Sequence, residues 1–260
     1  MKAELTVIGA SATAPTHLGP ASGYLLTTPT GSILIDCGPG VIGGLAKDRR
    51  LSDVNALLVS HSHADHSADL PVLAYRRSFP QVLPSVPLYA PEDLVSRLPK
   101  LDDVYGIPTL DTMKTPLGSR FEMNVREPGE DFEVLGNRVQ TILADHPVPT
   151  MSIKFPDLGF VYTADTGLTD ELVEFSRGAS LLLAECTYRA ADNVDVTGHG
   201  HLDGHTVGQL ARQAGVEHLA VTHLADPDHI RDIEAEVREV FDGKVTMCAP
   251  GDRFQLGSES

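Results

Sequence analysis

Short apolar runs alternate with amphipathic segments along the whole chain. Runs rich in Leu, Ile, Val, Phe and Tyr predict buried β-strands at residues 5–8, 24–27, 32–36, 56–59, 139–143, 160–163, 181–184 and 219–222. Apolar residues at helical spacing predict helices with one buried face at residues 66–75, 170–176, 206–214 and 229–240. This mixture predicts an α/β fold with two central sheets flanked by helices.

Nothing resembling a linker divides the 260 residues, so we expect one domain over residues 1–260. The Pro-rich segment 80–91 and the segment 102–116 are predicted to be surface loops within that domain. The two halves share a coarse pattern, because each has a β-run that ends in metal-binding residue types. Val59 leads to His61 in the first half, and Thr163 leads to Asp165 in the second.

Charge, hydropathy and cysteine content limit the partners, the cellular location and the cysteine chemistry that we expect. Thirty-six acidic against 20 basic residues give a formal charge of -16, which disfavours long nucleic acid. No apolar run approaches the ~20 residues that span a bilayer, and no signal-peptide pattern opens the chain, so we expect no membrane partner and a cytoplasmic location. Cys37, Cys186 and Cys248 lie far apart, which predicts buried thiols and neither a disulfide framework nor a thiolate metal site.

The densest candidate chemistry follows the predicted strand 56–59. His61, His63, Asp65 and His66 lie within six residues, between that strand and a predicted helix. A lone histidine is most often an ordinary satisfied residue, but four ligand-type side chains on one turn stay poorly paired unless a cation organises them. Residues i and i+2 of an extended loop point the same way, so His61 and His63 suit one ion and Asp65 with His66 a second.

This segment resembles the HxHxDH signature of the metallo-β-lactamase superfamily, whose fold is a four-layer αββα sandwich. Nearly the whole chain shares the resemblance, because His146, Asp165 and His223 follow in the expected order in Ala-Asp-His-Pro, Tyr-Thr-Ala-Asp-Thr-Gly and Thr-His-Leu. The resemblance implies that one ion is held by His61, His63 and His146, a second by Asp65, His66 and His223, and that Asp165 bridges both. It also implies that Asp36 supports the metal loop by bonding a ligand histidine or nearby backbone, the alternative being an ordinary turn residue.

Imidazole and carboxylate donors without thiolate favour zinc, while manganese or iron fit the same set. Two such divalent ions make an activated water available near neutral pH, so the resemblance implies a metal-dependent hydrolase.

Later motifs indicate a branch of this superfamily. Gly204-His205-Thr206-Val207-Gly208 follows Asp165 instead of preceding it, so we interpret it as a helix start with Asp203 or Thr206 near the cap. The segments Ala184-Glu185-Cys186-Thr187 and Gly200-His201-Leu202 resemble the ribonuclease Z-like branch. That resemblance implies that His201 assists the departing oxygen and that Glu185 orients it, which places both with Asp65 among the catalytic residues.

Two departures count against transfer RNA as the substrate. Ala184 stands where the tRNA-processing enzymes have a His before the Glu, and no basic insertion resembles their substrate-gripping arm. The resemblance is closer to small actinobacterial-type enzymes described as atypical class II cyclic-nucleotide phosphodiesterases. The motifs that carry it are Ala21-Ser22-Gly23-Tyr24-Leu25-Leu26, Asp69-Leu70-Pro71, Arg76-Arg77 and His201-Leu202. Arg76 or Arg77 is a candidate phosphate contact, with an exposed position on a helix as the alternative.

The sequence therefore predicts a phosphodiesterase with two metal ions that acts on a small-molecule phosphodiester such as a 3′,5′-cyclic nucleotide. A ribonuclease Z-like tRNA 3′ endonuclease is the first alternative. A hydrolase of another ester, a thioester or a lactone is the second, and a non-catalytic metal-binding module is the third. The resemblance also implies a homodimer, because related proteins often form dimers, although the sequence itself does not give the oligomeric state.

Overall fold

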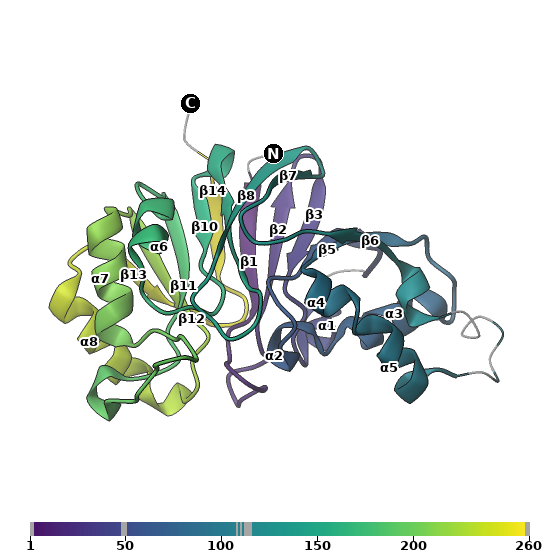
Figure 1. The fold of residues 1–260 in the computed structure, drawn as a ribbon, viewed down its shortest axis with the longest axis horizontal. Coiled ribbons are helices and arrows are strands. Elements are labelled where there is room, and N and C mark those ends of the chain that lie inside the picture. Colours follow the sequence, from purple (N-terminus) through teal and green to yellow (C-terminus); the bar gives the residue numbers. More distant parts are fainter. Residues whose placement is uncertain (1–2, 48–50, 108, 110, 112–115, 258–260) are drawn as a thin grey trace.

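Two facing sheets form the centre of the structure, a computed structural model that describes residues 3–47, 51–107, 109, 111 and 116–257 (Figure 1). Each sheet has seven strands within the described residues. The first sheet has the order β14-β1-β2-β3-β4-β5-β6, and the second has the order β13-β12-β11-β10-β9-β8-β7. In both sheets the strands pair antiparallel at one end and parallel at the other.

The strands of the first sheet are β1 (Ala3–Gly9), β2 (Gly23–Thr28), β3 (Gly31–Ile35), β4 (Val54–Leu58), β5 (Val86–Ala90), β6 (Phe121–Val125) and β14 (Arg253–Leu256). Those of the second are β7 (Asp131–Val134), β8 (Asn137–Leu143), β9 (Met151–Phe155), β10 (Phe160–Tyr162), β11 (Leu181–Glu185), β12 (His218–Thr222) and β13 (Lys244–Met247).

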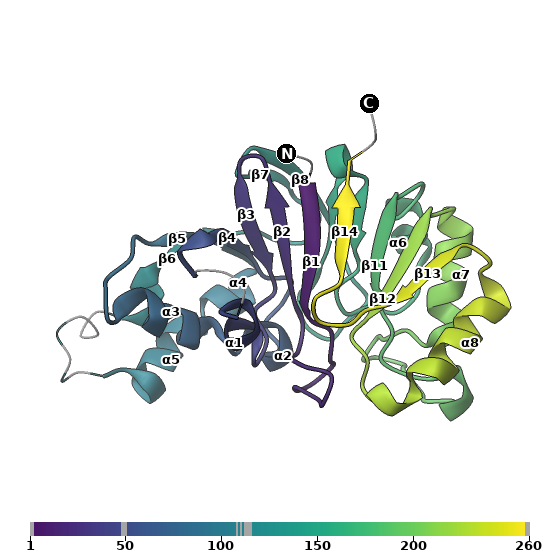
Figure 2. The same cartoon turned by 180° about the vertical axis from the view of Figure 1, so that it is seen from behind.

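Helices cover the outer face of each sheet, as Figures 1 and 2 show from opposite sides. The first sheet is flanked by α1 (Val41–Leu45), α2 (Ala64–Ser67), α3 (Leu70–Ser78), α4 (Glu92–Val95) and α5 (Leu98–Tyr105). The second is flanked by α6 (Asp170–Phe175), α7 (Gly204–Ala214) and α8 (Ile230–Val240). Three buried apolar clusters fill the spaces between the layers, one between the sheets and one under each helical layer. The predicted αββα sandwich is confirmed.

Continuous apolar runs revealed most of the strands that the sequence predicted. All eight predicted strands overlap strands of the structure, and β5, β6, β7, β9, β13 and β14 were not predicted. The predicted loop 80–91 is wrong in part, because it contains β5, where Val86, Leu88 and Ala90 are buried on one face. Pro87 between them made this strand look like a loop.

Two further boundaries differ from the prediction. The predicted helix 66–75 is two helices, α2 and α3, which are separated at Ala68 and Asp69. The predicted loop 102–116 begins inside α5, and its residues 108, 110 and 112–115 lie outside the described residues. All three cysteines are buried and free, as expected. Among the described residues, no helix has the length and apolar character that crossing a membrane requires.

Helix α7 begins at a capping box on the side of the fold that carries His201. The Asp203 carboxylate accepts a hydrogen bond from the Thr206 backbone N–H at 2.8 Å, and the Thr206 hydroxyl accepts one from the Asp203 N–H at 2.8 Å. Each bond satisfies a donor that the first turn of a helix leaves without an intrahelical partner.

We predict that Asp203→Ala lowers the free energy of unfolding by about 1 kcal/mol, because one of these donors loses its acceptor. Thermal unfolding followed by circular dichroism should show a melting temperature lower by roughly 2–4 °C. Asp203→Asn keeps an acceptor oxygen and is the matched control. Equal melting temperatures for the Ala variant and the wild type would contradict the assigned cap.

Candidate metal centre

The predicted ligand residues meet where parallel strands of both sheets end. His61 follows β4 in the first sheet, while Asp165 follows β10 and His223 follows β12 in the second. The backbone of Asp36, Ala164 and His223 is left-handed, with φ of 57°, 51° and 58°. Non-glycine residues rarely adopt this conformation, and they persist where the surrounding structure holds them, often at functional sites.

All seven predicted ligand side chains lie in two groups that share one carboxylate. The donor atoms of each group lie within 4.8 Å of one another: His61, His63, His146 and Asp165 in the first, and Asp65, His66, Asp165 and His223 in the second.

The Asp165 carboxylate faces both groups with different oxygens. Its Oδ2 lies 3.7 Å from Nε2 of His61 and 3.9 Å from Nε2 of His146. Its Oδ1 lies 3.2 Å from Nε2 of His66 and 3.3 Å from Nε2 of His223. This is the arrangement that a bridging carboxylate requires.

Orphaned polar atoms show that the site fits cations. His61 Nε2 and Asp165 Oδ1 are buried without a hydrogen-bond partner. The His66 Nδ1–H donates to Asp36 Oδ2 at 2.8 Å, so Nε2 is the ring atom that faces Asp165 Oδ1, at 3.2 Å. Buried lone pairs that face one another repel unless a cation lies between them. The His/Asp cluster is therefore compatible with two divalent metal ions.

Asp36 holds in place the loop that carries His61, His63, Asp65 and His66. Its carboxylate accepts hydrogen bonds from the Ser60 N–H at 2.7 Å, the Ser60 hydroxyl at 3.0 Å, the Tyr162 hydroxyl at 2.7 Å and the His66 imidazole at 2.8 Å. Sequence reasoning singled out Asp36 but missed Ser60 and Tyr162. Ser60 directly precedes His61, a signal that was available, whereas Tyr162 becomes a neighbour only when the two sheets pack.

Two backbone groups hold further candidate ligands. The Thr13 N–H donates to Asp65 Oδ2 at 2.7 Å, and the carbonyl oxygen of Gly200 lies 3.2 Å from His146 Nδ1. Gly200 has φ of 39°, and a Cβ there would lie 1.7 Å from the carbonyl oxygen of Asp145. Only glycine therefore fits at this position beside His146.

His201 and Glu185 form a third group beside the second candidate metal position. His201 Nδ1 lies 2.7 Å from Glu185 Oε1, and the His201 ring centroid lies 5.2 Å from that of His146 and 5.9 Å from that of His223. Burial lowers the pKa of His201, but the hydrogen bond and charge of Glu185, together with the charges of Asp165 and Asp65, outweigh it, so the pKa is raised. The raised pKa favours the protonated imidazole next to the two ligand groups.

The two candidate arginines lie in the last turn of α3, where Arg77 is buried and Arg76 is exposed. Arg77 is 4% exposed, and its guanidinium donates to the carbonyl oxygens of Pro84 at 2.7 Å and Leu51 at 3.4 Å. The exposed position suggested for it is therefore wrong, and its donors are already used inside the protein. Arg76 Nη1 donates to the carbonyl oxygen of Phe79 at 3.4 Å.

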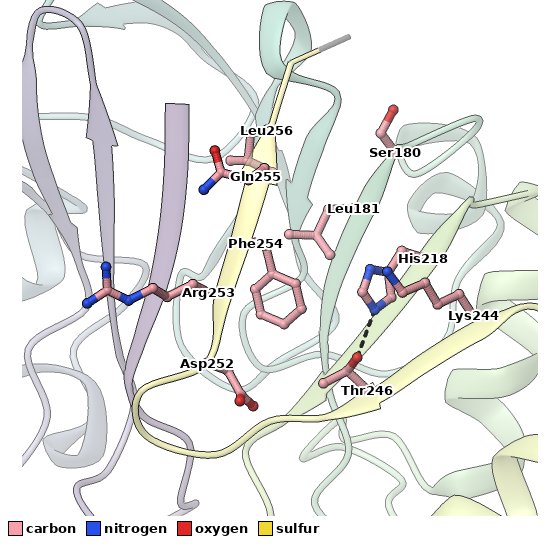
Figure 3. A pocket seen from close by; sticks show the side chains of 10 residues that line it. All are labelled: Ser180, Leu181, His218, Lys244, Thr246, Asp252, Arg253, Phe254, Gln255 and Leu256. Atoms are coloured by element: carbon pink, nitrogen blue, oxygen red, sulfur yellow. Dashed lines mark hydrogen bonds between the residues drawn. The ribbon is translucent and has the colours of Figure 1, made fainter. Parts of the chain in front are cut away.

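A separate cleft of about 500 Å³ lies between β14 and the strands β11 to β13 (Figure 3). The imidazole of His218 lies 2.9 Å from the Thr246 hydroxyl there, and its ring centroid is 5.4 Å from that of Phe254. Leu181 and His218 begin β11 and β12, whereas the candidate ligands follow the opposite ends of the parallel strands. This cleft is therefore not part of the metal centre.

The sequence profile of the beta-lactamase superfamily domain matches residues 32–224. An uncharacterized protein of Mycobacterium tuberculosis is 33% identical over 260 residues, which cover 97% of this chain and 92% of that protein. The probable metallo-hydrolase YhfI of Bacillus subtilis is 28% identical over 254 residues, covering 95% of this chain and 98% of YhfI. Ribonuclease Z of Thermobifida fusca is 27% identical over 304 residues, covering 94% of this chain and 92% of that enzyme.

Solved structures agree with this placement. The crystal structure of YhfI has a TM-score of 0.82 at 27% identity and covers 98% of this chain and 100% of that one. The short form of human tRNase Z has a TM-score of 0.74 at 19% identity, covering 98% of this chain and 100% of that one. Yeast PDE1 has a TM-score of 0.69 at 12% identity, covering 99% of each chain. The last two similarities show a common fold.

The sandwich fold, the His/Asp cluster at its strand ends and these relatives define the class of the protein as a metallo-hydrolase. The chain belongs to the beta-lactamase superfamily and fits its ribonuclease Z-like branch.

We predict that metal-free protein takes up two divalent ions per chain, because the two donor groups are distinct although they share Asp165. Elemental analysis after reconstitution with zinc or manganese measures the stoichiometry. His146→Ala removes a donor from the first group alone and should leave one tightly bound ion. His205→Ala, on an exposed face of α7, is the control and should keep two. A single occupied position in saturated wild type would contradict this prediction.

Proposed function

We propose that this metallo-hydrolase is a phosphodiesterase for compact phosphodiesters, with a 3′,5′-cyclic nucleotide as the best single candidate. The observation that carries the proposal is the placement of His201, whose imidazole is bonded to Glu185 and lies against both candidate metal positions. Hydrolysis of an ester needs a group that protonates the departing oxygen, and a histidine held by a carboxylate suits this task.

In this proposal His61, His63 and His146 would hold one ion, Asp65, His66 and His223 a second, and Asp165 would bridge them. Zinc fits the donors best, and manganese or iron suit them as well. When bound, the two ions supply an activated water and stabilise the negative charge that develops on the substrate.

The chain's own residues would supply the proton and hold the candidate ligands in place. With Nδ1 of His201 engaged by Glu185 at 2.7 Å, the ring's Nε2 is the atom from which a proton can reach the leaving alkoxide. The raised pKa of His201 favours the protonated form that this step requires. Thr13, Asp36 and the carbonyl of Gly200 hold Asp65, His66 and His146 in place.

Net charge favours a small phosphate ester over a polymer, and one relative supports chemistry at phosphorus. The formal charge of -16 repels an extended polyanion, whereas a metal pair supplies positive charge only at the site. The name ribonuclease Z, carried by a relative 27% identical to this chain, denotes cleavage of RNA, a phosphodiester polymer. That name supports chemistry at phosphorus. Ala184 stands at the position where the resemblance leads us to expect a histidine in tRNA-processing enzymes.

The remaining expectations belong to the same proposal. They are a single hydrolase domain over residues 1–260, a cytoplasmic location, no membrane partner and a homodimer. Size-exclusion chromatography with light scattering tests the last of these directly.

We predict that His201→Ala lowers kcat about 10²- to 10⁴-fold at unchanged metal content, because it removes the proton donor and no metal ligand. Steady-state kinetics on a generic phosphodiester, with elemental analysis of the same samples, measures both quantities. His205→Ala serves as the histidine control. Loss of metal in proportion to activity would make His201 a ligand and contradict its assignment.

We predict turnover of cyclic AMP or cyclic GMP to the nucleoside monophosphate, and little cleavage of precursor transfer RNA under the same metal and salt conditions. Product analysis by chromatography separates the two outcomes, and thioester and lactone substrates complete the panel. Efficient RNA cleavage without cyclic-nucleotide turnover would favour the nuclease. Turnover of the thioester or lactone alone would favour those ester classes, and no turnover of any substrate by the metal-loaded protein would favour a binding module.

A further inference from the structure

The Thr187 hydroxyl lies next to the second group of candidate ligands, within hydrogen-bonding distance of Glu185, His201 and His223. We infer that Thr187 is a positioning residue, which fixes the tautomer and orientation of His223 and connects that imidazole to Glu185. This inference rests on the proposed function, because His223 matters as a ligand only if the site binds metal.

Thr187 is 5% exposed, and its Oγ1 has three close polar neighbours. It lies 2.9 Å from Glu185 Oε2, 3.0 Å from His223 Nδ1 and 3.2 Å from His201 Nδ1. The Thr187 N–H also donates to Glu185 Oε2, at 3.0 Å. Thr187 is therefore bonded to Glu185 through its backbone N–H as well as through its hydroxyl.

Counting protons assigns the direction of each bond. A hydroxyl has one proton and two lone pairs, while an ionised carboxylate only accepts. The Thr187 proton therefore goes to Glu185 Oε2, and Oγ1 accepts from the Nδ1–H of His223. His201 Nδ1 has a closer acceptor, Glu185 Oε1 at 2.7 Å, and so does not depend on Thr187.

The consequence is a defined state of His223. With the proton on Nδ1, its Nε2 lone pair points at the metal position, where Asp65 Oδ2 lies at 3.2 Å and Asp165 Oδ1 at 3.3 Å. The opposite tautomer would put an N–H where a ligand lone pair is needed. Partners of this kind commonly change metal affinity 10- to 100-fold when they are removed.

The first half of the chain repeats the arrangement with different residues, which argues against a chance contact. Asp36 bonds His66 Nδ1 directly at 2.8 Å, and it accepts from the Ser60 hydroxyl, which lies 3.0 Å from His61 Nδ1. Each half thus has one carboxylate that holds one histidine directly and a second through a hydroxyl. Through Thr187, Glu185 serves both the proposed proton donor His201 and the candidate ligand His223.

Thr187→Val and Thr187→Ser test this inference as a pair. Valine keeps the branched shape but removes the hydroxyl, whereas serine keeps it. We expect Thr187→Val to bind one of its two metal ions 10- to 100-fold more weakly in chelator competition, with the other unchanged. Thr187→Ser should restore wild-type affinity and kcat. Circular dichroism checks that each variant is folded.

A second measurement needs neither metal nor activity. Nitrogen chemical shifts of ¹⁵N-labelled histidine in metal-free wild type should show His223 with its proton on Nδ1, and Thr187→Val should lose this preference. A wild-type His223 without a proton on Nδ1 overturns the inference even if the valine variant does not fold. Unchanged metal affinities in a folded Thr187→Val protein overturn it as well. Wild type that binds no metal would instead contradict the proposed function, while the tautomer still tests Thr187.

Discussion

The structure depends on one electrostatic constraint, which is that five imidazoles and two carboxylates converge in a buried space with too few hydrogen-bond partners. Buried polar groups of this kind are costly unless a partner compensates them. The unpaired His61 Nε2 and the two-sided Asp165 carboxylate show that protein groups alone do not supply that partner. Divalent cations would supply it, because each would remove the repulsion among several lone pairs at once.

Two other carboxylates, Asp36 and Glu185, hold histidines of the site in defined orientations. Both are fully buried, and each holds one histidine directly and a second through a hydroxyl. Asp36 is tied to the opposite sheet by the Tyr162 hydroxyl, so the packing of the two sheets also sets the orientation of the metal loop. The packing of the apolar core between the sheets therefore also positions the polar site at their edge.

The differences between expectation and structure have local causes. Arg77 looks like a surface residue beside Arg76, but the helix turns it inward, where the carbonyls of Pro84 and Leu51 satisfy its donors. Strand β5 was missed because Pro87 interrupts a short apolar alternation that tertiary pairing with β4 and β6 stabilises. Neither feature can be read from a window of neighbouring residues, since each depends on segments distant in sequence.

The sequence by itself determined the two central sheets with flanking helices and the donor chemistry, because apolar periodicity and the His61–His66 cluster are local patterns. It also singled out Asp36, Glu185 and His201, through resemblance to a known signature. Only the tertiary structure decided that Asp165 presents one oxygen to each group, that Thr187 lies between Glu185 and His223, and that Thr13 donates to Asp65. These contacts join residues from separate strands and loops, so they exist only once those segments have folded against one another.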